Sequence, residues 1–89
     1  MKVLKFGAVW CPGCLVMRPM WQEIEKENPW LKNEYFDYDQ GKEAVQKWNI
    51  DETLPTFVFV DKNEQELFRL QGEISKRELL KLLLENKDK

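Results

Sequence analysis

The chain has 89 residues, with 14 Lys or Arg against 16 Asp or Glu and a net charge of −2. This length predicts one domain over residues 1–89, and the charge balance provides no basic face for nucleic acid. The apolar run at residues 56–60 is too short to span a membrane, and Lys5 and Trp10 do not fit a secretion signal or its processing site. We therefore expect a cytoplasmic protein that does not associate with membranes.

The first half of the chain predicts two strands and two helices. Loose alternation predicts a strand at residues 3–6, and apolar residues at helical spacing predict a helix from residue 11 to about 27. Pro19 falls inside this helix and is expected to kink it. A strand rich in aromatic residues at 34–38 and a short helix at 42–48 follow.

The second half predicts two more strands and a final helix. Residues 56–60 are apolar on both faces, as in a central strand that is covered on both sides. A turn leads to a more polar strand at 65–71, which we expect to be antiparallel and near an edge. Ser75 and Glu78 have the capping-box spacing ahead of a leucine-rich helix. The order β-α-β-α-β-β-α predicts an α/β fold, in which a four-stranded mixed sheet is flanked by three helices.

The only two cysteines lie in the run Trp10-Cys11-Pro12-Gly13-Cys14, at the start of the first predicted helix. Backbone N–H groups and the helix dipole at that end favour a thiolate, so we predict Cys11 as the attacking thiol. Pro12 suits the first helical position, because its missing N–H costs nothing there. Cys14, one turn further and facing the core, would resolve a mixed disulfide. The pair predicts thiol–disulfide exchange.

Two other interpretations of the pair are weaker. A structural zinc site needs four Cys or His ligands, whereas this chain has two cysteines and no histidine, so a metal would have to lie between two chains. An inert structural disulfide would close a very short loop and stabilise the fold little. No glycine-rich phosphate loop is present either. We therefore predict a redox pair with no bound metal and no cofactor.

With these elements, the sequence resembles the thioredoxin family over nearly its whole length. The resemblance is carried by the Trp-Cys-x-x-Cys run, by Pro19 in the helix that follows, and by Leu54-Pro55-Thr56, which looks like the family's cis-proline loop. Gly72, followed by Ser75 as a helix cap, is similar to a third loop beside the family's active site. The resemblance implies a thioredoxin-like fold that lacks the extra N-terminal strand and helix of larger thioredoxins.

The resemblance also implies a substrate site around the cysteines. Pro55 would face the sulfurs, and Leu54 would keep its backbone N–H and carbonyl free to pair with an extended substrate. Trp10 would shield the thiol and offer apolar contact to a polypeptide. The predicted catalytic residues are Cys11 and Cys14, and the predicted substrate-binding residues are Trp10, Pro12, Leu54, Pro55 and Gly72, with Ile74 at the apolar rim.

Two positions depart from the family's pattern. Where thioredoxins usually carry a buried acid that helps to deprotonate the second cysteine, this chain has Lys5. A lysine there would favour a thiolate by its charge but could not accept the proton; alternatively, Lys5 simply reaches solvent. Tyr35 matches the position that often holds a lysine partner of that acid. The group that assists Cys14 is therefore left open between water and an unidentified side chain.

The expected activity is that of a thioredoxin-like protein-disulfide oxidoreductase in cell redox homeostasis. It would act as a monomer on disulfide-containing proteins and take electrons from a separate reductase, expected to be a flavoprotein. A glutaredoxin-like protein reduced by glutathione is an alternative, although residues 72–75 lack the second glycine and the acid usual in glutathione sites. A non-catalytic module that binds a metal between two chains is the other alternative.

Overall fold

A computed structural model describes residues 1–89 and contains the predicted elements in the predicted order. The strands are β1 (Lys2–Gly7), β2 (Lys32–Asp37), β3 (Thr56–Val60) and β4 (Glu66–Gln71), and the helices are α1 (Pro12–Glu27), α2 (Lys42–Lys47) and α3 (Lys76–Asn86). Every predicted strand and helix is confirmed, with small shifts at the ends. The helix α1 continues on both sides of Pro19, so this proline does not end it; the kink stays a prediction.

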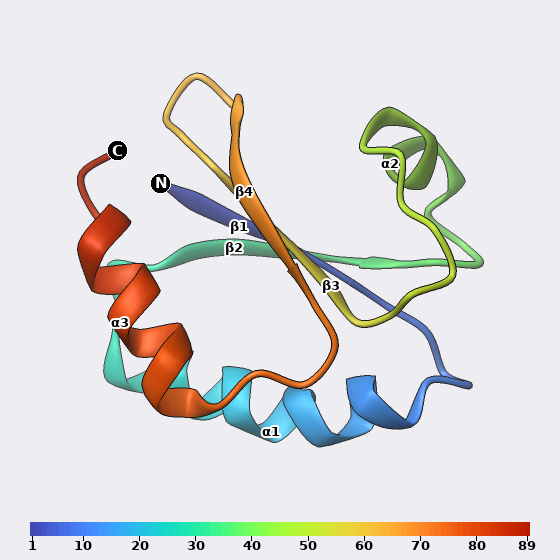
Figure 1. Cartoon of the computed structure of the whole chain (residues 1–89), viewed down its shortest axis with the longest axis horizontal. Coiled ribbons are helices and arrows are strands. Elements are labelled where there is room, and N and C mark those ends of the chain that lie inside the picture. The colour runs from blue at the N-terminus through green and yellow to red at the C-terminus, as the bar shows by residue number, and fades with distance from the viewer.

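The strands form one four-stranded sheet in the order β2-β1-β3-β4 (Figure 1). β1 pairs in parallel with β2 and antiparallel with β3, and β4 pairs antiparallel with β3 at the edge, as predicted. β3 lies inside the sheet, and all of its residues are buried. β1 is the other inner strand, with a neighbour on each side.

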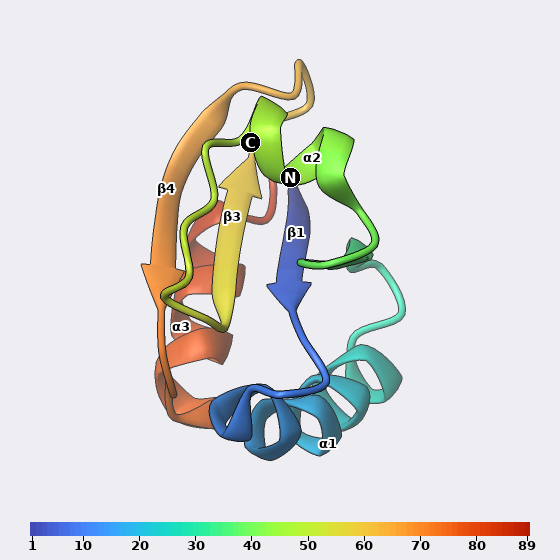
Figure 2. The same cartoon turned by 90° about the vertical axis from the view of Figure 1, so that its right-hand side faces the viewer.

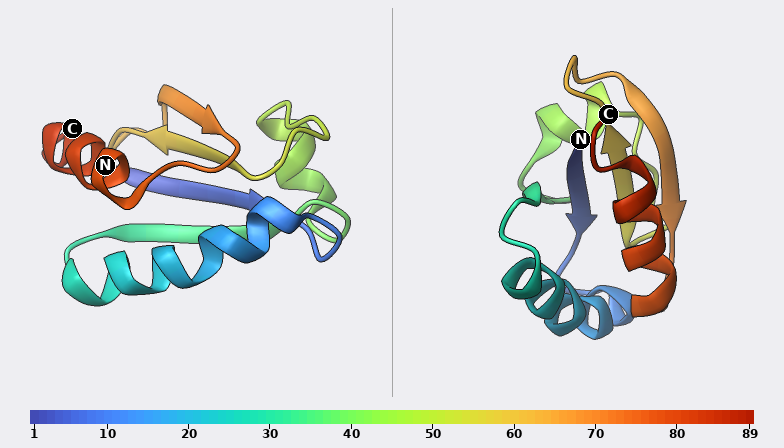
Figure 3. Two further views of the ribbon diagram at one scale, coloured as in Figure 1. Left: turned by 60° about the horizontal axis from the view of Figure 1, so that its bottom comes forward. Right: turned by 90° about the vertical axis from the view of Figure 1, so that its left-hand side faces the viewer.

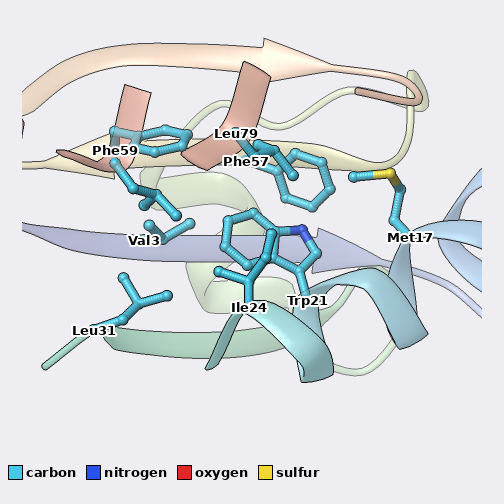
Figure 4. Close-up of a cluster of buried hydrophobic side chains, with 9 residues drawn as sticks. Val3, Met17, Trp21, Ile24, Leu31, Phe57, Phe59 and Leu79 are labelled. Atoms are coloured by element: carbon cyan, nitrogen blue, oxygen red, sulfur yellow. The ribbon is translucent and has the colours of Figure 1, made fainter. Parts of the chain in front are cut away.

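The two faces of the sheet carry separate apolar cores. On one face, α1 and α3 cover β1 and β3, and Figure 4 shows the resulting cluster of Val3, Met17, Trp21, Ile24, Leu31, Phe57, Phe59, Leu79 and Leu83. On the other face, α2 and the loop after it cover a smaller cluster of Leu4, Phe6, Ile50, Val58 and Val60. In Figure 2, α2 lies in front of the sheet and α3 lies behind it. Successive residues of β1 and β3 thus serve opposite cores, as the two-residue period of a strand requires.

The start of α3 is fixed in two ways. The Ser75 hydroxyl accepts a 3.2 Å hydrogen bond from the Glu78 N–H, so the predicted cap is confirmed. The Lys76 ammonium bridges to α1, with its Nζ 2.6 Å from Glu23 and 3.0 Å from Glu27. The hydrogen bond to Glu23, followed by that to Glu27, raises the pKa of Lys76 above its ordinary value. These contacts hold α3 against α1 and set the loop between β4 and α3.

The cysteine pair and the chain termini lie at opposite ends of the molecule. The loop from β1 into α1 occupies one end, whereas the N- and C-termini lie close together at the other (Figures 1 and 3). No helix of the chain combines the length and the apolar character that crossing a membrane requires.

Candidate active site

Cys11 and Cys14 form a disulfide across the first turn of α1, with their Cα atoms 5.3 Å apart. Cys11 is the N-cap of the helix, and its sulfur accepts a 3.2 Å hydrogen bond from the backbone N–H of Cys14. Pro12 occupies the first helical position, as predicted. A cap side chain normally satisfies one of the free N–H groups of a helix start. Here a sulfur has that role, so a donor is already aimed at Cys11 when the pair opens to a thiolate.

Both sulfurs lie beneath an apolar rim. Cys11 is 3% exposed and Cys14 is 8% exposed, and they cluster with the buried Ala8. By contrast, Val9 and Trp10 in the preceding loop are 77% and 52% exposed. A polypeptide that approaches the disulfide would therefore meet apolar side chains before it reached sulfur.

The loop before β3 lies against the cysteine motif. The peptide bond between Leu54 and Pro55 is cis. A Cβ placed on Gly13 would lie 3.0 Å from Cδ of Pro55 and 4.0 Å from the Leu54 carbonyl oxygen, so the glycine is what allows this close approach. Neither the N–H nor the carbonyl of Leu54 takes part in a backbone hydrogen bond. Both groups are therefore available for an extended strand from a partner.

The loop between β4 and α3 is joined to the same place. The N–H of Gly72 donates a 2.8 Å hydrogen bond to the Pro55 carbonyl, and its φ of 87° is one that favours glycine. Ile74 is half-buried and packs against the core beneath α1 and α3, and its place at the apolar rim stays a prediction. Gly72 is thus bonded to Pro55, which in turn lies against Gly13 of the cysteine motif.

Asp39 is a site residue that the sequence reasoning missed. Its Oδ2 accepts a 2.8 Å hydrogen bond from the indole N–H of Trp10, and the Trp10 ring meets Tyr38 edge-on with the centroids 6.1 Å apart. The Asp39 N–H in turn donates to Asp37, which fixes the loop after β2. The parallel pairing of β1 and β2 could have indicated that Asp39 lies near Trp10, because the residues that follow two such strands meet at one edge of the sheet.

One of the two alternatives for Lys5, that its side chain simply reaches solvent, does not hold in the structure. Its side chain is 13% exposed, its ammonium lies 3.0 Å from a Glu25 carboxylate oxygen, and it sits 5.4 Å from the centre of the Trp21 ring. The reason is that β1 is an inner strand covered by α1, rather than a poorly covered one. Glu25 lies about 16 Å further along α1 than Cys14, from the rise of a helix. The Lys5 charge is therefore drawn away from the sulfurs.

A cavity of about 360 Å³ runs between α1 and the sheet and reaches Cys14. Its polar lining comes from β1, α1 and β2 and consists of Lys5, Arg18, Gln22, Glu25 and Tyr35. Pro55 and Gly7 close the end beside the sulfur. Cys14 is thus the cysteine that lines this partly open pocket, together with polar side chains.

Comparisons of this chain with a family model, with related sequences and with solved structures all find thioredoxins. A family model described as Thioredoxin matches residues 1–85. Thioredoxin H5 of Oryza sativa subsp. japonica is 36% identical over 70 residues, which cover 79% of this chain and 50% of that protein. Thioredoxin H4-2 of the same organism is 38% identical over 70 residues, again covering 79% of this chain and 52% of the relative.

Among solved structures, the X-ray structure of Fasciola hepatica thioredoxin superimposes with a TM-score of 0.85 at 30% identity. The match covers 96% of this chain and 79% of that chain. The chain spans about half the length of the plant relatives that it matches.

Proposed function

Because the chain belongs to the thioredoxin family and has its fold, we propose that it is a protein-disulfide oxidoreductase that works through the Cys11–Cys14 couple. One observation carries the proposal: the disulfide spans the first turn of α1 with Cys11 as the N-cap, beside the loop that contains cis-Pro55. This arrangement combines a redox-active pair, a donor for a thiolate and a free backbone edge for a substrate.

The reductive half-reaction proceeds in two exchanges. The Cys11 thiolate attacks one sulfur of a substrate disulfide, a Cys11–substrate bond forms, and the other substrate sulfur leaves as a thiolate and takes up a proton. The Cys14 thiolate then attacks Cys11, the mixed disulfide breaks, and the second substrate sulfur leaves in the same way. The substrate gains two electrons, and the protein is left with the Cys11–Cys14 disulfide.

Substrate binding uses the surface around the sulfurs. The exposed Trp10 and Pro12 contact apolar side chains of the substrate, and the free N–H and carbonyl of Leu54 pair with its extended backbone. Gly72 holds the Pro55 loop from the other side. The substrates are therefore disulfide-containing polypeptides in an extended conformation.

The proposal also covers the oligomeric state, the location and the electron donor of the protein. Residues 1–89 act as one domain and as a monomer in the cytoplasm, need no cofactor, and receive electrons from a separate flavoprotein reductase. A second copy is not needed, because both cysteines and the substrate edge come from one chain.

The first test is the midpoint potential of the Cys11–Cys14 couple, measured in defined dithiol/disulfide buffers by thiol trapping. A reversible two-electron transition is expected, and a midpoint near about −270 mV would indicate a reductase whereas one near about −120 mV would indicate a disulfide donor. The absence of any reversible transition would contradict the proposal and lead to a search for bound metal.

A second test separates the roles of the two cysteines. A reduced Cys14→Ser variant is expected to accumulate a stable mixed disulfide with a disulfide-containing substrate such as oxidised insulin, because Cys11 attacks the substrate disulfide and no second thiol releases it, whereas Cys11→Ser forms none. Trapping through Cys14 instead would reverse the assigned roles. If the protein reduced its disulfide substrate with electrons from glutathione and glutathione reductase, but not from a flavoprotein thioredoxin reductase, the glutaredoxin-like alternative would be favoured.

A further inference from the structure

The second exchange needs a Cys14 thiolate, and the usual acid beside this sulfur is absent. Lys5 stands at that position and is engaged by Glu25. Glu25 is the only carboxylate that lines the cavity behind Cys14, and it lies about three helical turns away from the sulfur. The neutral polar side chains that line the cavity are Gln22 and Tyr35, and either type can donate a hydrogen bond to a thiolate.

Tyr35 brings such a group to the sulfur. β1 and β2 pair in parallel with Lys5 opposite Tyr35 and Gly7 opposite Asp37, so Lys5, Gly7 and Tyr35 share one face of the sheet. A Cβ placed on Gly7 would lie 3.0 Å from the Tyr35 hydroxyl oxygen and 3.2 Å from Cys14 Sγ. The hydroxyl and the sulfur thus border the same small space above Gly7, which only a glycine leaves open.

The Tyr35 hydroxyl has no hydrogen-bond partner within the protein, whereas Lys5 and Glu25 in the same cavity are paired with each other. No side-chain hydrogen bond involves Tyr35, although Lys5 is paired with Glu25 in the same cavity. The ring of Tyr35 is partly exposed, but its polar end turns inward over Gly7. A phenol O–H is a donor that a sulfur anion can accept.

From this geometry we infer that Tyr35 is a positioning residue for the resolving step, in which its hydroxyl donates a hydrogen bond across Gly7 to the Cys14 thiolate. The inference rests on the proposed function. Cys14 gives its proton to water, and Tyr35 keeps its own proton throughout. The thiolate then attacks Cys11, and the departing substrate sulfur is protonated from solvent. The hydroxyl thus stabilises the anion that the missing acid would otherwise have generated.

Other charged groups near Cys14 define the electrostatic background of this hydrogen bond. Lys5 from β1 and Arg18 and Glu25 from α1 line the same cavity. Asp37 lies opposite Gly7 in β2, and Glu73 approaches Gly13 from the loop before α3. All of these remain in place when only the Tyr35 hydroxyl is removed, so the Tyr35→Phe change isolates one donor.

The test is the ionisation of Cys14 alone, followed by the ¹³Cβ shift of labelled cysteine in a Cys11→Ser background, with and without Tyr35→Phe. Removing Cys11 leaves a single titrating thiol, which avoids the coupling of two nearby thiols. Tyr35→Phe is expected to raise the midpoint pH of Cys14 by about one unit, the effect of losing one hydrogen bond to a charged group. The matched control is Tyr38→Phe: the Tyr38 ring packs against the cluster of Ala8, Cys11 and Cys14, and the variant keeps that ring while removing the only other tyrosine hydroxyl, so the Cys14 midpoint is expected to stay unchanged.

The kinetic readout uses the chain with both cysteines. In Tyr35→Phe, release of substrate from a preformed Cys11 mixed disulfide at neutral pH should be slower by between about threefold and tenfold. Formation of the mixed disulfide should keep its rate, because the inferred hydrogen bond acts on Cys14 and not on Cys11. An unchanged Cys14 midpoint in Tyr35→Phe, or an equal shift in Tyr38→Phe, would overturn the inference while insulin reduction by the unaltered chain still supported the proposed function. If that chain lacked reversible exchange, the proposed function would fail, whatever the titration showed.

Discussion

Trp10 and Asp39 are joined by a 2.8 Å hydrogen bond from the indole N–H to a carboxylate oxygen. The bond links the residue that precedes the cysteine pair to the loop after β2, so two loops that are distant in sequence act as one wall beside the disulfide. Half of the Trp10 side chain remains in solvent while its polar end is held. The contact orients an apolar surface for a partner instead of adding to the core.

Replacing Asp39 with alanine is expected to weaken substrate recognition while the fold is kept. Without the acceptor, Trp10 samples more rotamers, and binding must order it again, at a cost of about 1 kcal/mol. The kcat/KM for insulin reduction should fall about fivefold, mainly through KM. The control is Asp88→Ala, which removes the same charge near the C-terminus. Equal losses in both variants would mean that charge alone, and not the Trp10 contact, is responsible.

The packing of α3 predicts a large difference between two leucines on the same helix. Leu79 is fully buried against the sheet, whereas Leu84 is 60% exposed. Leu79→Ala is expected to lower the free energy of unfolding by about 2–5 kcal/mol, because it leaves a cavity, and Leu84→Ala by less than about 0.5 kcal/mol. Urea denaturation of both variants measures the difference. Similar losses would show that α3 does not pack as described.

The Glu66–Arg69 pair predicts a small, acid-sensitive contribution to stability. The hydrogen bond from Arg69 holds the pKa of Glu66 below its ordinary value of 4.5. A carboxyl whose pKa is lower in the folded state stabilises the fold above its unfolded pKa, and that stabilisation is lost as the pH falls through the folded value. Glu66→Gln should therefore destabilise the protein at pH 7 and have little effect well below the ordinary carboxyl pKa.

The size of this effect is limited because the pair is partly exposed. The side chains of Arg69 and Glu66 are 29% and 34% exposed, so a loss below about 1 kcal/mol is expected. Urea denaturation of the unaltered chain and of Glu66→Gln at several pH values provides the measurement, with Glu85→Gln as a control at an exposed carboxylate. A difference that persisted unchanged into acid would rule out the charge of Glu66 as its source.

Lys5 is expected to have no part in the thiol chemistry, although it occupies a position near the site in sequence. Its ammonium is held by Glu25, away from the sulfurs. Lys5→Met should leave the pH dependence of insulin reduction unchanged. Lys2→Met, which breaks the Lys2–Glu34 pair on the same strand, is the matched control. If the acid limb of the pH–rate profile shifted in Lys5→Met but not in Lys2→Met, the charge of Lys5 would act on the cysteines.

The sequence was sufficient to predict the elements and the cysteine motif because those depend on local chemistry. The apolar run of β3, the cap at Ser75 and the sulfur of Cys11 as a partner for the first N–H groups of α1 each follow from neighbours along the chain. Gly72 was also placed correctly in the third loop, where its positive φ excludes most other residues.

The sequence was insufficient wherever a side chain meets a residue far along the chain. The partners Trp10 and Asp39 are 29 positions apart, and only the parallel pairing of β1 and β2, which is not a local feature, brings them together. Lys5 reads as a solvent-facing lysine until the sheet order makes β1 an inner strand. Tyr35 was identified only as a missing lysine, because the space that it shares with Cys14 depends on the parallel register of two strands.

The position of the termini has a practical consequence. Both ends of the chain emerge together, on the side of the molecule remote from the start of α1 (Figures 1 and 3). Attachment to an electrode, a bead or a fusion partner through either end would leave the end of the molecule that carries the disulfide facing the solution. Such an immobilised protein should exchange electrons with large substrates as readily as the free one, and a linker at the start of α1 should not.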